Sequence, residues 1–303
     1  MRVRQLAAVA FACAWLGATT GAQSYVPNRV FDSARNAFSD FEAMAADLTR
    51  ADVVFLGEQH DDPNTHRLEL AVLEALARRG RSVVLSLEMF ERDTQEPLDH
   101  FQMGHSSEDE FLKSSRPWPR YATDYKPLVD FAIAKNWPVV AANVPRPIAS
   151  EIAKSGLDVL LNKGEADRKL YAHDLVCPTT DAYFKRFAEV MGGHPAPGAA
   201  ADEAARTTER YYFSQCVKDE TMAESIVAAY AAGAAGPSRP VVVHVNGAFH
   251  SDYAQGTAAR VIRRLPGKRV AVISIQPVAD LDTLTPGDDA KRIGDYVIYT
   301  TKK

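Results

Sequence analysis

Short apolar segments alternate along the chain with longer segments whose apolar residues repeat at helical spacing. Four of the short segments are rich in β-branched residues and stop abruptly at polar residues: 53–56, 83–87, 139–142 and 241–245. Continuous apolar runs of this length are typical of strands in a parallel sheet that is buried on both faces. Their alternation with helical segments implies parallel pairing through right-handed crossovers.

The segments between these runs carry the signals that begin and end helices. Asp62 is placed to cap a helix that has Pro63 in its first turn, and Gly80 is placed to end it. Residues 95–136 have a helical pattern that two proline-containing segments interrupt. Helices are therefore expected between the first three strands.

The alternation stops between about residues 156 and 236, where several helical patterns occur without a convincing strand. The sheet resumes at 241–245, crosses through a helix at 252–264, and continues with strands at 270–275 and 296–300, the last at an edge. We predict an α/β fold with a mainly parallel central sheet flanked by helices, and a helical insert subdomain at about 156–236.

The first 22 residues have the pattern of a secretory signal peptide: a small basic region, an apolar stretch, and small residues at 20–22 that suit cleavage. Cys13 lies inside the apolar stretch and not just after it, so a lipid anchor is not favoured. The expected mature chain, 23–303, has no apolar run near the ~18 residues that span a bilayer. We expect a periplasmic or secreted protein without a transmembrane segment.

Charge and motifs argue against several classes of function. Acidic residues outnumber basic ones, 39 against 35, and the formal net charge is −4. Nucleic-acid binding uses a basic surface, so no nucleic-acid partner is expected. The sequence also lacks HExxH, GxSxG, P-loop and GxGxxG patterns, which are the signatures of zincins, α/β-hydrolases, nucleoside-triphosphate sites and dinucleotide sites.

The expected mature chain contains two cysteines, Cys177 and Cys216. An exported protein enters an oxidising compartment, so a disulfide between them is the first hypothesis and two buried free thiols are the alternative. In the chain-entropy model, a bridge closing a loop of roughly 40 residues stabilises the fold by up to ~4 kcal/mol.

Residues capable of chemistry follow the apolar runs, and ligands of parallel sheets bind at the carboxyl ends of the strands. Glu58 and His60 follow the first run. A carboxylate beside an imidazole can be an acid/base pair, a pair of metal ligands, or a histidine oriented by its partner. The alternative is a helix-capping glutamate beside a surface histidine.

Glu88 follows the second run and is itself followed by Met89 and Phe90. Apolar surroundings would raise the pKa of its carboxyl and suit it to general acid or base catalysis. Arg92 or Arg146 is expected to counter its charge. The alternative is a salt bridge that only fixes the loop.

The last two runs add an amide, a cation and two imidazoles. Asn143 and Arg146 suit a bound carboxylate, phosphate or propionate, and a structural ion pair is the alternative for Arg146. Two interpretations of His244 are open: it takes part in function, or it is a core histidine whose polar atoms are hydrogen-bonded. His250 precedes Ser251, a candidate helix N-cap, and a helix N-terminus would keep the imidazole neutral. One cleft is predicted to bring together six side chains: Glu58, His60, Glu88, Asn143, Arg146 and His250.

Five motifs occur in order between about residues 50 and 275. Each alone is a weak signal of a protein family, but the five together are a specific one. They are Gly-Glu-Gln-His-Asp at 57–61, Leu-Glu-Met-Phe at 87–90, Ala-Asn-Val-Pro-Arg at 142–146, Asp-Glu-Thr-Met-Ala at 219–223 and His-Val-Asn-Gly-Ala-Phe-His at 244–250. With these motifs the chain resembles the ChaN-like haem-binding uptake proteins, placed with the Tiki and erythromycin-esterase-like proteins. The resemblance implies an α/β domain with a smaller helical part, and a role in haem or iron acquisition. From hydrolases of the wider superfamily it also implies the site positions Glu58, His60, Glu88 and His250, supported by Asn143, Arg146 and His244.

The leading functional hypothesis is an exported haem-binding protein of iron acquisition. Tyrosine is a haem ligand in proteins, and the insert offers four candidate cofactor-binding residues: Tyr183, His194, Tyr211 and Tyr212. An aromatic wall exposed on the insert would let one protomer cover the haem of another, which favours a homodimer when haem is bound. The alternative is a metal-assisted or acid/base hydrolase that uses the strand-end cluster, with a divalent metal as its cofactor.

Overall fold

A single mixed sheet organises the molecule, as the computed structural model shows for residues 26–192, 201–234 and 239–302. In these residues the sheet has eight strands in the order β2-β1-β8-β7-β3-β6-β4-β5. The strands are β1 (Asn28–Asp32), β2 (Ala37–Ser39), β3 (Val53–Glu58), β4 (Val83–Glu91), β5 (Val139–Asn143), β6 (Val241–Gly247), β7 (Val270–Val278) and β8 (Tyr296–Thr301). Every pair from β8 to β5 is parallel, which confirms the predicted α/β fold with a mainly parallel sheet.

The position predicted for the last strand is wrong, because β8 lies inside the sheet. It pairs in parallel with β7 on one side and antiparallel with β1 on the other, with Val30 opposite Ile298. The hairpin of β1 and β2 forms the true edge. Its strands have five and three residues, too short for an apolar pattern to stand out in the sequence.

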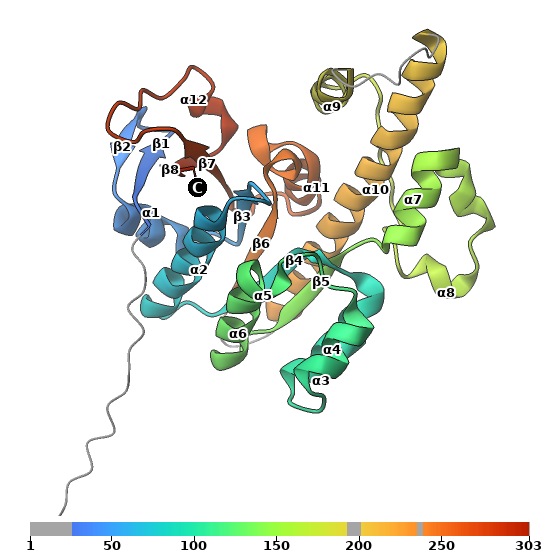
Figure 1. Ribbon diagram of the computed structural model, residues 1–303, viewed down its shortest axis with the longest axis horizontal. Coiled ribbons are helices and arrows are strands. Elements are labelled where there is room, and N and C mark those ends of the chain that lie inside the picture. The colour runs from blue at the N-terminus through green and yellow to red at the C-terminus, as the bar shows by residue number, and fades with distance from the viewer. Residues whose placement is uncertain (1–25, 193–200, 235–238, 303) are drawn as a thin grey trace, which may run out of the picture.

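Helices cover one face of the sheet and enclose the larger apolar core. These are α1 (Phe41–Leu48), α2 (Pro63–Arg78), α3 (Gln95–Gln102), α4 (Glu108–Ser115), α5 (Tyr121–Asp124) and α6 (Lys126–Ala134). Figure 1 shows α2 and α6 on one side of the central strands and α10 and α11 on the other. Asp62 caps α2 as predicted, since its side chain accepts hydrogen bonds from two backbone amides of the first turn. Leu73 of α2 and Leu128 of α6 are fully buried in this core with Leu56 of β3.

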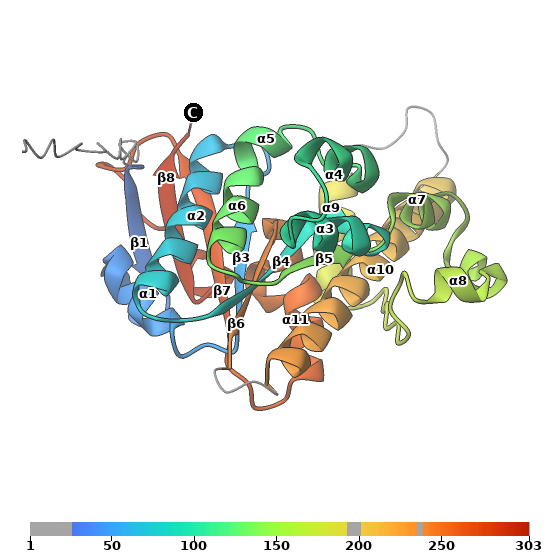
Figure 2. The ribbon, with the colours of Figure 1, turned by 90° about the horizontal axis from the view of Figure 1, so that it is seen from below.

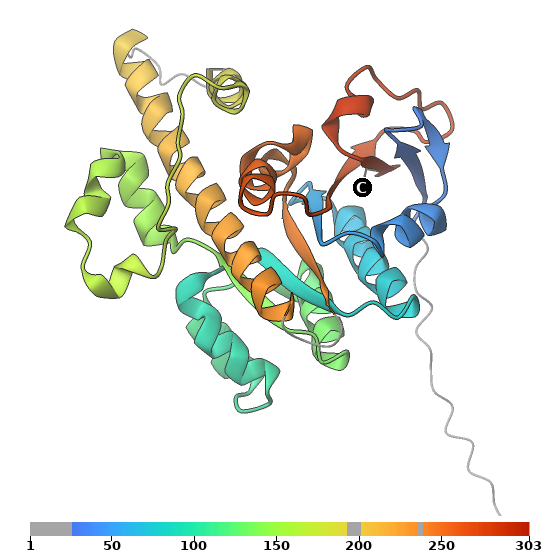
Figure 3. The same cartoon turned by 180° about the vertical axis from the view of Figure 1, so that it is seen from behind.

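Two helices cover the opposite face, α10 (Ala201–Ala234) and α11 (Gly256–Arg264). Ile226 of α10 and Val261 of α11 pack against Phe55 of β3 and Val242 of β6 in a second, smaller core. The short helix α12 (Ala290–Ile293) precedes β8, and between β5 and α10 the chain forms α7 (Arg146–Ser155), α8 (Glu165–Arg168) and α9 (Ala182–Gly192). Figures 2 and 3 show that these three and the first half of α10 extend beyond the sheet. No strand occurs in the described part of 156–236, in keeping with the predicted helical segment.

The helix predicted at 252–264 begins later, at Gly256. Residues 252–254 form a short 3₁₀ turn, and the positive φ angles of Tyr253 (62°) and Ala254 (51°) prevent a right-handed helix from continuing through them. Ser251 does not cap α11, whose N-cap position is Gln255, and its side chain makes no capping hydrogen bond. Its hydroxyl accepts a hydrogen bond from the side-chain amide of Asn246 instead.

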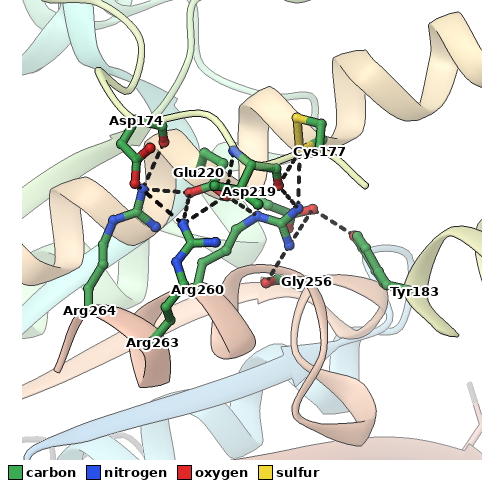
Figure 4. Close-up of a disulfide and its surroundings, with 11 residues drawn as sticks. Asp174, Cys177, Tyr183, Asp219, Glu220, Gly256, Arg260, Arg263 and Arg264 are labelled. Carbon is green, nitrogen blue, oxygen red and sulfur yellow. Dashed lines mark hydrogen bonds and ion pairs between the residues drawn. A yellow bond between two sulfur atoms is a disulfide. The ribbon is translucent and has the colours of Figure 1, made fainter. Parts of the chain in front are cut away.

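A disulfide joins Cys177 to Cys216, with their Cα atoms 5.7 Å apart, so the first hypothesis for these cysteines is confirmed. It ties the segment before α9 to the middle of α10. Figure 4 shows the bridge beside Glu220 and three arginines of α11. Glu220 is fully buried, and Arg260 and Arg263 both lie 3.0 Å from its carboxylate oxygens. Three arginines on one carboxylate fix α11 to α10.

Two predictions fall on residues that the structure does not describe: the signal peptide at 1–22 and the candidate ligand His194. Among the helices of the described ranges, none combines the length and the apolar character that crossing a membrane requires.

Candidate functional site

A cleft of about 530 Å³ opens at the carboxyl ends of β3, β4 and β6. Its polar lining comes from several elements: Glu58, Gln59, His60, Glu88, Arg186, Gln215, Lys218, His250 and Asp252. Trp118 and Phe249 supply aromatic walls. Four residues predicted to converge therefore line one cleft: Glu58, His60, Glu88 and His250.

Asn143 and Arg146 do not line this cleft, and their predicted convergence is wrong. Asn143 is buried at the end of β5, where its amide donates to the Glu88 carbonyl and its oxygen accepts from the Val144 amide. Arg146 begins α7 and faces solvent, with its guanidinium 3.5 Å from Glu91. β5 is the last strand of the sheet, one position beyond β4, so its carboxyl end lies beside the cleft.

His244 is a buried residue of β6 and does not line the cleft. Its Nδ1 lies 2.8 Å from the Ser86 hydroxyl, and its ring packs edge-on against Phe55. Burial lowers the pKa of His244 to about 3, so the imidazole is neutral. His244 is thus a buried core residue with one ring nitrogen hydrogen-bonded, because its Nε2 has no partner among the described residues.

The first catalytic candidates, Glu58 and His60, are in direct contact. His60 Nδ1 lies 2.5 Å from Glu58 Oε1, which also accepts the Tyr125 hydroxyl at 2.7 Å. Since a carboxylate only accepts, Nδ1 carries the proton and Nε2 is left for the cleft. Burial alone lowers the pKa of His60, but the hydrogen bond to Glu58 and the charge of Glu88 outweigh it, and the pKa lies above its usual value.

Gly247 makes room for the His60 ring. A Cβ atom added at Gly247 would lie 2.5 Å from His60 Nε2, so the His60 ring would have to move from its position in the cleft. Gly247 also donates its backbone N–H to Glu88 Oε2 at 2.8 Å. The turn after β6 thus positions His60 and Glu88 through one residue that has no side chain.

The deepest part of the cleft holds an acid–imidazole–acid series. His250 Nε2 lies 3.3 Å from Glu88 Oε1, and His250 Nδ1 lies 2.7 Å from Asp219 Oδ1. Asp219, on α10, also accepts hydrogen bonds from the hydroxyls of Tyr183 and Thr257. Both ring nitrogens of His250 face carboxylates, so both carry protons and the ring is an imidazolium.

The electrostatics of this series reverse two predictions. His250 is not neutral at a helix N-terminus, because burial, which lowers its pKa, is outweighed by Glu88 and Asp219, and the pKa rises to about 10. The pKa of Glu88 is not raised, because the charge and hydrogen bond of His250 outweigh burial and hold it well below its usual value. Arg92 does not counter Glu88; it pairs with Glu224 at 3.0 Å.

Asp252 is a second carboxyl group with unusual acidity in the same cleft. Burial raises the pKa of Asp252 to about 7, against the opposing effects of a Ser274 hydrogen bond and the Arg186 charge. Its Oδ1 has no hydrogen-bond partner among the described residues. Arg186 of α9 donates to the Phe249 and Asp252 carbonyls and stacks on the Phe249 ring, which closes this side of the cleft.

A second cluster of ionisable groups lies behind Glu58, on α2 and α5. His66 Nδ1 lies 3.6 Å from Glu58 Oε2 and 3.3 Å from Glu69 Oε2, and His66 Nε2 lies 3.5 Å from Asp124. All four residues are buried. Burial and the neighbouring Glu58 raise the pKa of Glu69 well above its usual value.

The candidate haem ligands of the insert lie in different environments. Tyr183 and Tyr212 are buried beside the disulfide in an aromatic cluster with Phe184 and Phe187. Tyr211 is 43% exposed. The predicted aromatic wall is therefore largely packed inside the insert, with only part of it open to solvent.

Sequence reasoning assigned no site role to Asp219, Asp252, His66 or Glu69. Asp219 belongs to one of the five motifs. Because it lies in a segment predicted to be helical, the sequence did not indicate that it would lie beside a strand end. His66 and Glu69 could have been identified from the sequence. They lie one turn apart on the buried face of α2, where polar residues interrupt the apolar stripe.

Comparisons with known proteins agree with this fold. ChaN of Campylobacter jejuni, whose structure shows cofacial haem binding, aligns over 90% of this chain and 97% of its own with a TM-score of 0.65 and 17% identity. A mutant of the erythromycin esterase EreC in its open conformation aligns over 91% and 83% of the two chains, but its TM-score of 0.46 and 13% identity are too low to bear on function.

One curated relative is similar in sequence. The chloroplastic protein RETICULATA-RELATED 5 of Arabidopsis thaliana is 28% identical in an alignment of length 244 that covers 76% of this chain and 32% of that protein. The chain thus spans about a third of its length. Residues 44–261 match the family described as haem-binding uptake, Tiki superfamily, ChaN, and this match covers most of the sequence. The protein therefore belongs to the ChaN family of haem-binding uptake proteins in the Tiki superfamily.

Proposed function

We propose that this protein is an exported haem-binding protein of iron acquisition, with haem held on the outer surface of α9 and α10. The observation that carries this proposal is an exposed phenol: Tyr211 is 43% exposed on α10, and Val190 is 57% exposed on the neighbouring α9. Haem needs an apolar wall, an axial ligand and cations for its propionates. Exposed Lys185 and Arg206 on the same two helices supply the cations.

Tyr211 is the best-placed axial ligand among the described candidates. Ligation by tyrosine requires a phenolate. The Tyr183 hydroxyl donates a hydrogen bond to Asp219, and burial raises the pKa of Tyr183 well above the usual value. Burial also raises the pKa of Tyr212 to about 12. His194 stays a candidate outside the described residues.

A homodimer in the haem-bound state is part of this proposal. Haem on an exposed helical surface has one face toward solvent, and an apolar face of that size favours a covering partner. In ChaN of Campylobacter jejuni haem binding is cofacial. We expect a second copy of this chain to cover the open face of the haem. The disulfide between Cys177 and Cys216 supports an oxidising compartment, as a periplasmic or secreted location provides.

Replacing Tyr211 with phenylalanine is expected to weaken hemin binding by roughly tenfold or more, equivalent to ~1.4 kcal/mol. The high-spin ferric spectrum typical of phenolate ligation should also disappear. Hemin titration followed by absorption, with the oligomeric state read by light scattering, checks both. Tyr183→Phe and Tyr212→Phe are matched controls that should retain the spectrum. Unchanged binding in Tyr211→Phe would exclude this site.

We also propose an alternative function, acid/base hydrolysis in the strand-end cleft. The observation that favours it is the contrast of acidities around one cavity: ionised Glu88, an imidazolium at His250, and Asp252 with a pKa near 7. His60, oriented by Glu58 and with its side chain 44% exposed, has a free Nε2 that can take a proton from water. Asp252 can return a proton to a leaving group.

Changing His60 to alanine is expected to reduce such hydrolysis by roughly 10²–10⁴-fold, the usual contribution of a general base. Activity in wild type should rise with pH as His60 loses its proton, and fall again as Asp252, with a pKa of about 7, becomes ionised. A panel of ester and amide substrates, assayed with and without divalent cations, measures both effects. Tyr211→Phe is the control and should keep full activity. A His60→Ala variant as active as wild type would remove His60 from the chemistry.

A further inference from the structure

Three ligand-capable side chains meet behind the cleft, on the side of Glu58 that faces away from His60. Glu58 comes from the end of β3, and His66 and Glu69 come from consecutive turns of α2. One oxygen or nitrogen from each residue lies within 4.8 Å of the others. All three residues are at most 4% exposed.

The two carboxylates bring more acceptor oxygens than the protein satisfies. Glu58 Oε1 is occupied by His60 and Tyr125. Glu58 Oε2 has no hydrogen-bond donor among the described residues, and it lies 3.6 Å from His66 Nδ1. Glu69 Oε1 likewise finds no donor in the described chain. Buried acceptors of this kind are normally paired with donors or cations.

The surroundings of His66 orient its ring as they do for metal-bound histidines. Its Nε2 lies 3.2 Å from the His60 carbonyl oxygen and 3.5 Å from Asp124, so Nε2 carries the proton. The lone pair of Nδ1 then points at the two carboxylates. A histidine that donates its second N–H to a carbonyl or carboxylate is the usual arrangement around a metal.

We propose that Glu58, His66 and Glu69 form a buried site for one divalent transition-metal ion. The separations of 3.3 and 3.6 Å between His66 Nδ1 and the two carboxylates match those of neighbouring ligands at ~2.1 Å from a shared ion. One imidazole with two carboxylates suits zinc, iron or manganese better than calcium. The ion would lie outside the cleft and would fix Glu58, which in turn orients His60.

The test measures metal binding without haem or substrate, so it is independent of the proposed function. Protein stripped with a chelator is loaded with Mn²⁺ or Zn²⁺, desalted, and its metal content is determined by mass spectrometry. We expect about one ion per chain in wild type and at least a tenfold loss of affinity in Glu69→Gln. Glu88→Gln changes a carboxylate of the cleft only, and should bind like wild type.

Two outcomes would overturn the proposal. Wild type that binds no ion at neutral pH would mean that Glu58 and Glu69 share a proton instead. Loss of binding in Glu88→Gln but not in Glu69→Gln would place the ion in the cleft. Because a variant of buried Glu69 can fail to fold, pulsed electron paramagnetic resonance on Mn²⁺-loaded wild type provides a second measurement. Coupling to one histidine nitrogen supports the site; coupling to none or to two contradicts it.

Discussion

Replacing Asp219 with asparagine is expected to lower the free energy of unfolding by about 3–5 kcal/mol near pH 7. Asp219 is fully buried and holds the imidazolium of His250 at 2.7 Å. The same carboxylate accepts the Tyr183 hydroxyl and lies 3.9 Å from Arg260. Asparagine keeps the shape but removes the charge. Among the described residues, Glu88 is then the remaining carboxylate that pairs with the buried cation.

The pH dependence of stability should change with it. The folded pKa of His250 is about 10, above the unfolded value of 6.5, so its contribution is complete below pH 6.5 and is lost as pH rises toward 10. The pKa of Glu88 is lowered, so its contribution is present above the unfolded value of 4.5 and is lost as pH falls. In Asp219→Asn the His250 pKa drops, and the alkaline loss should become smaller.

Urea unfolding of both proteins between pH 5 and 10 measures this. Asp174→Asn is a matched control, because Asp174 is 73% exposed and lies 3.8 Å from Arg263. Exposed ion pairs contribute little, so its change should stay within ~0.5 kcal/mol. Equal stability of Asp219→Asn and wild type across the whole range would show that His250 is not a buried cation.

Reducing the disulfide is expected to cost about 4 kcal/mol of stability in the chain-entropy model, since Cys177 and Cys216 are 39 residues apart. Loss of the bridge frees the unfolded chain and also releases the segment that leads into α9. Tyr183, six residues beyond Cys177, would then hold Asp219 less firmly. Unfolding in urea with and without reductant gives the difference directly.

The control for this experiment is the double variant Cys177→Ser with Cys216→Ser. It should unfold as reduced wild type does, and reductant should not change its curve. Mass spectrometry after alkylation confirms the redox state of each sample. Two alkylated thiols in the unreduced protein, or identical curves once reduction is verified, would contradict a stabilising bridge.

The central strands could be predicted because the residues of each strand alone identify it, without knowledge of its neighbours in the fold. A run such as Val83 to Leu87 is apolar on both faces wherever the chain places it. The start of α11 could not be predicted in this way. Ser251 is a residue type that often caps helices, but its hydroxyl accepts a hydrogen bond from Asn246. The left-handed backbone of Tyr253 and Ala254 then prevents the helix from beginning before Gly256. Tertiary contacts decide such boundaries.

The candidate site was predictable only where strand ends define it. Glu58, His60, Glu88 and His250 lie in or just after the carboxyl ends of strands that lie side by side, so the order of the sheet brings them together. Asn143 follows a strand one position further out and falls beside the cleft. The pKa values of the site residues could not be predicted from the sequence. The pKa of Glu88, for example, depends on His250, which is distant in sequence and lies just after β6. Asp219 comes from α10, a helix of the insert, and not from a strand end.

The pairing of β1 with β8 has a consequence for how the chain acquires its structure. Val30 lies near the beginning of the described chain, and its partner Ile298 lies near the end. During synthesis the first hairpin emerges long before the strand that completes it. Pairings so distant in sequence form slowly, because loop closure must precede any gain from contact. Until β8 arrives, β1 exposes an unpaired edge, so the nascent chain is most prone to aggregation before its last strand is made.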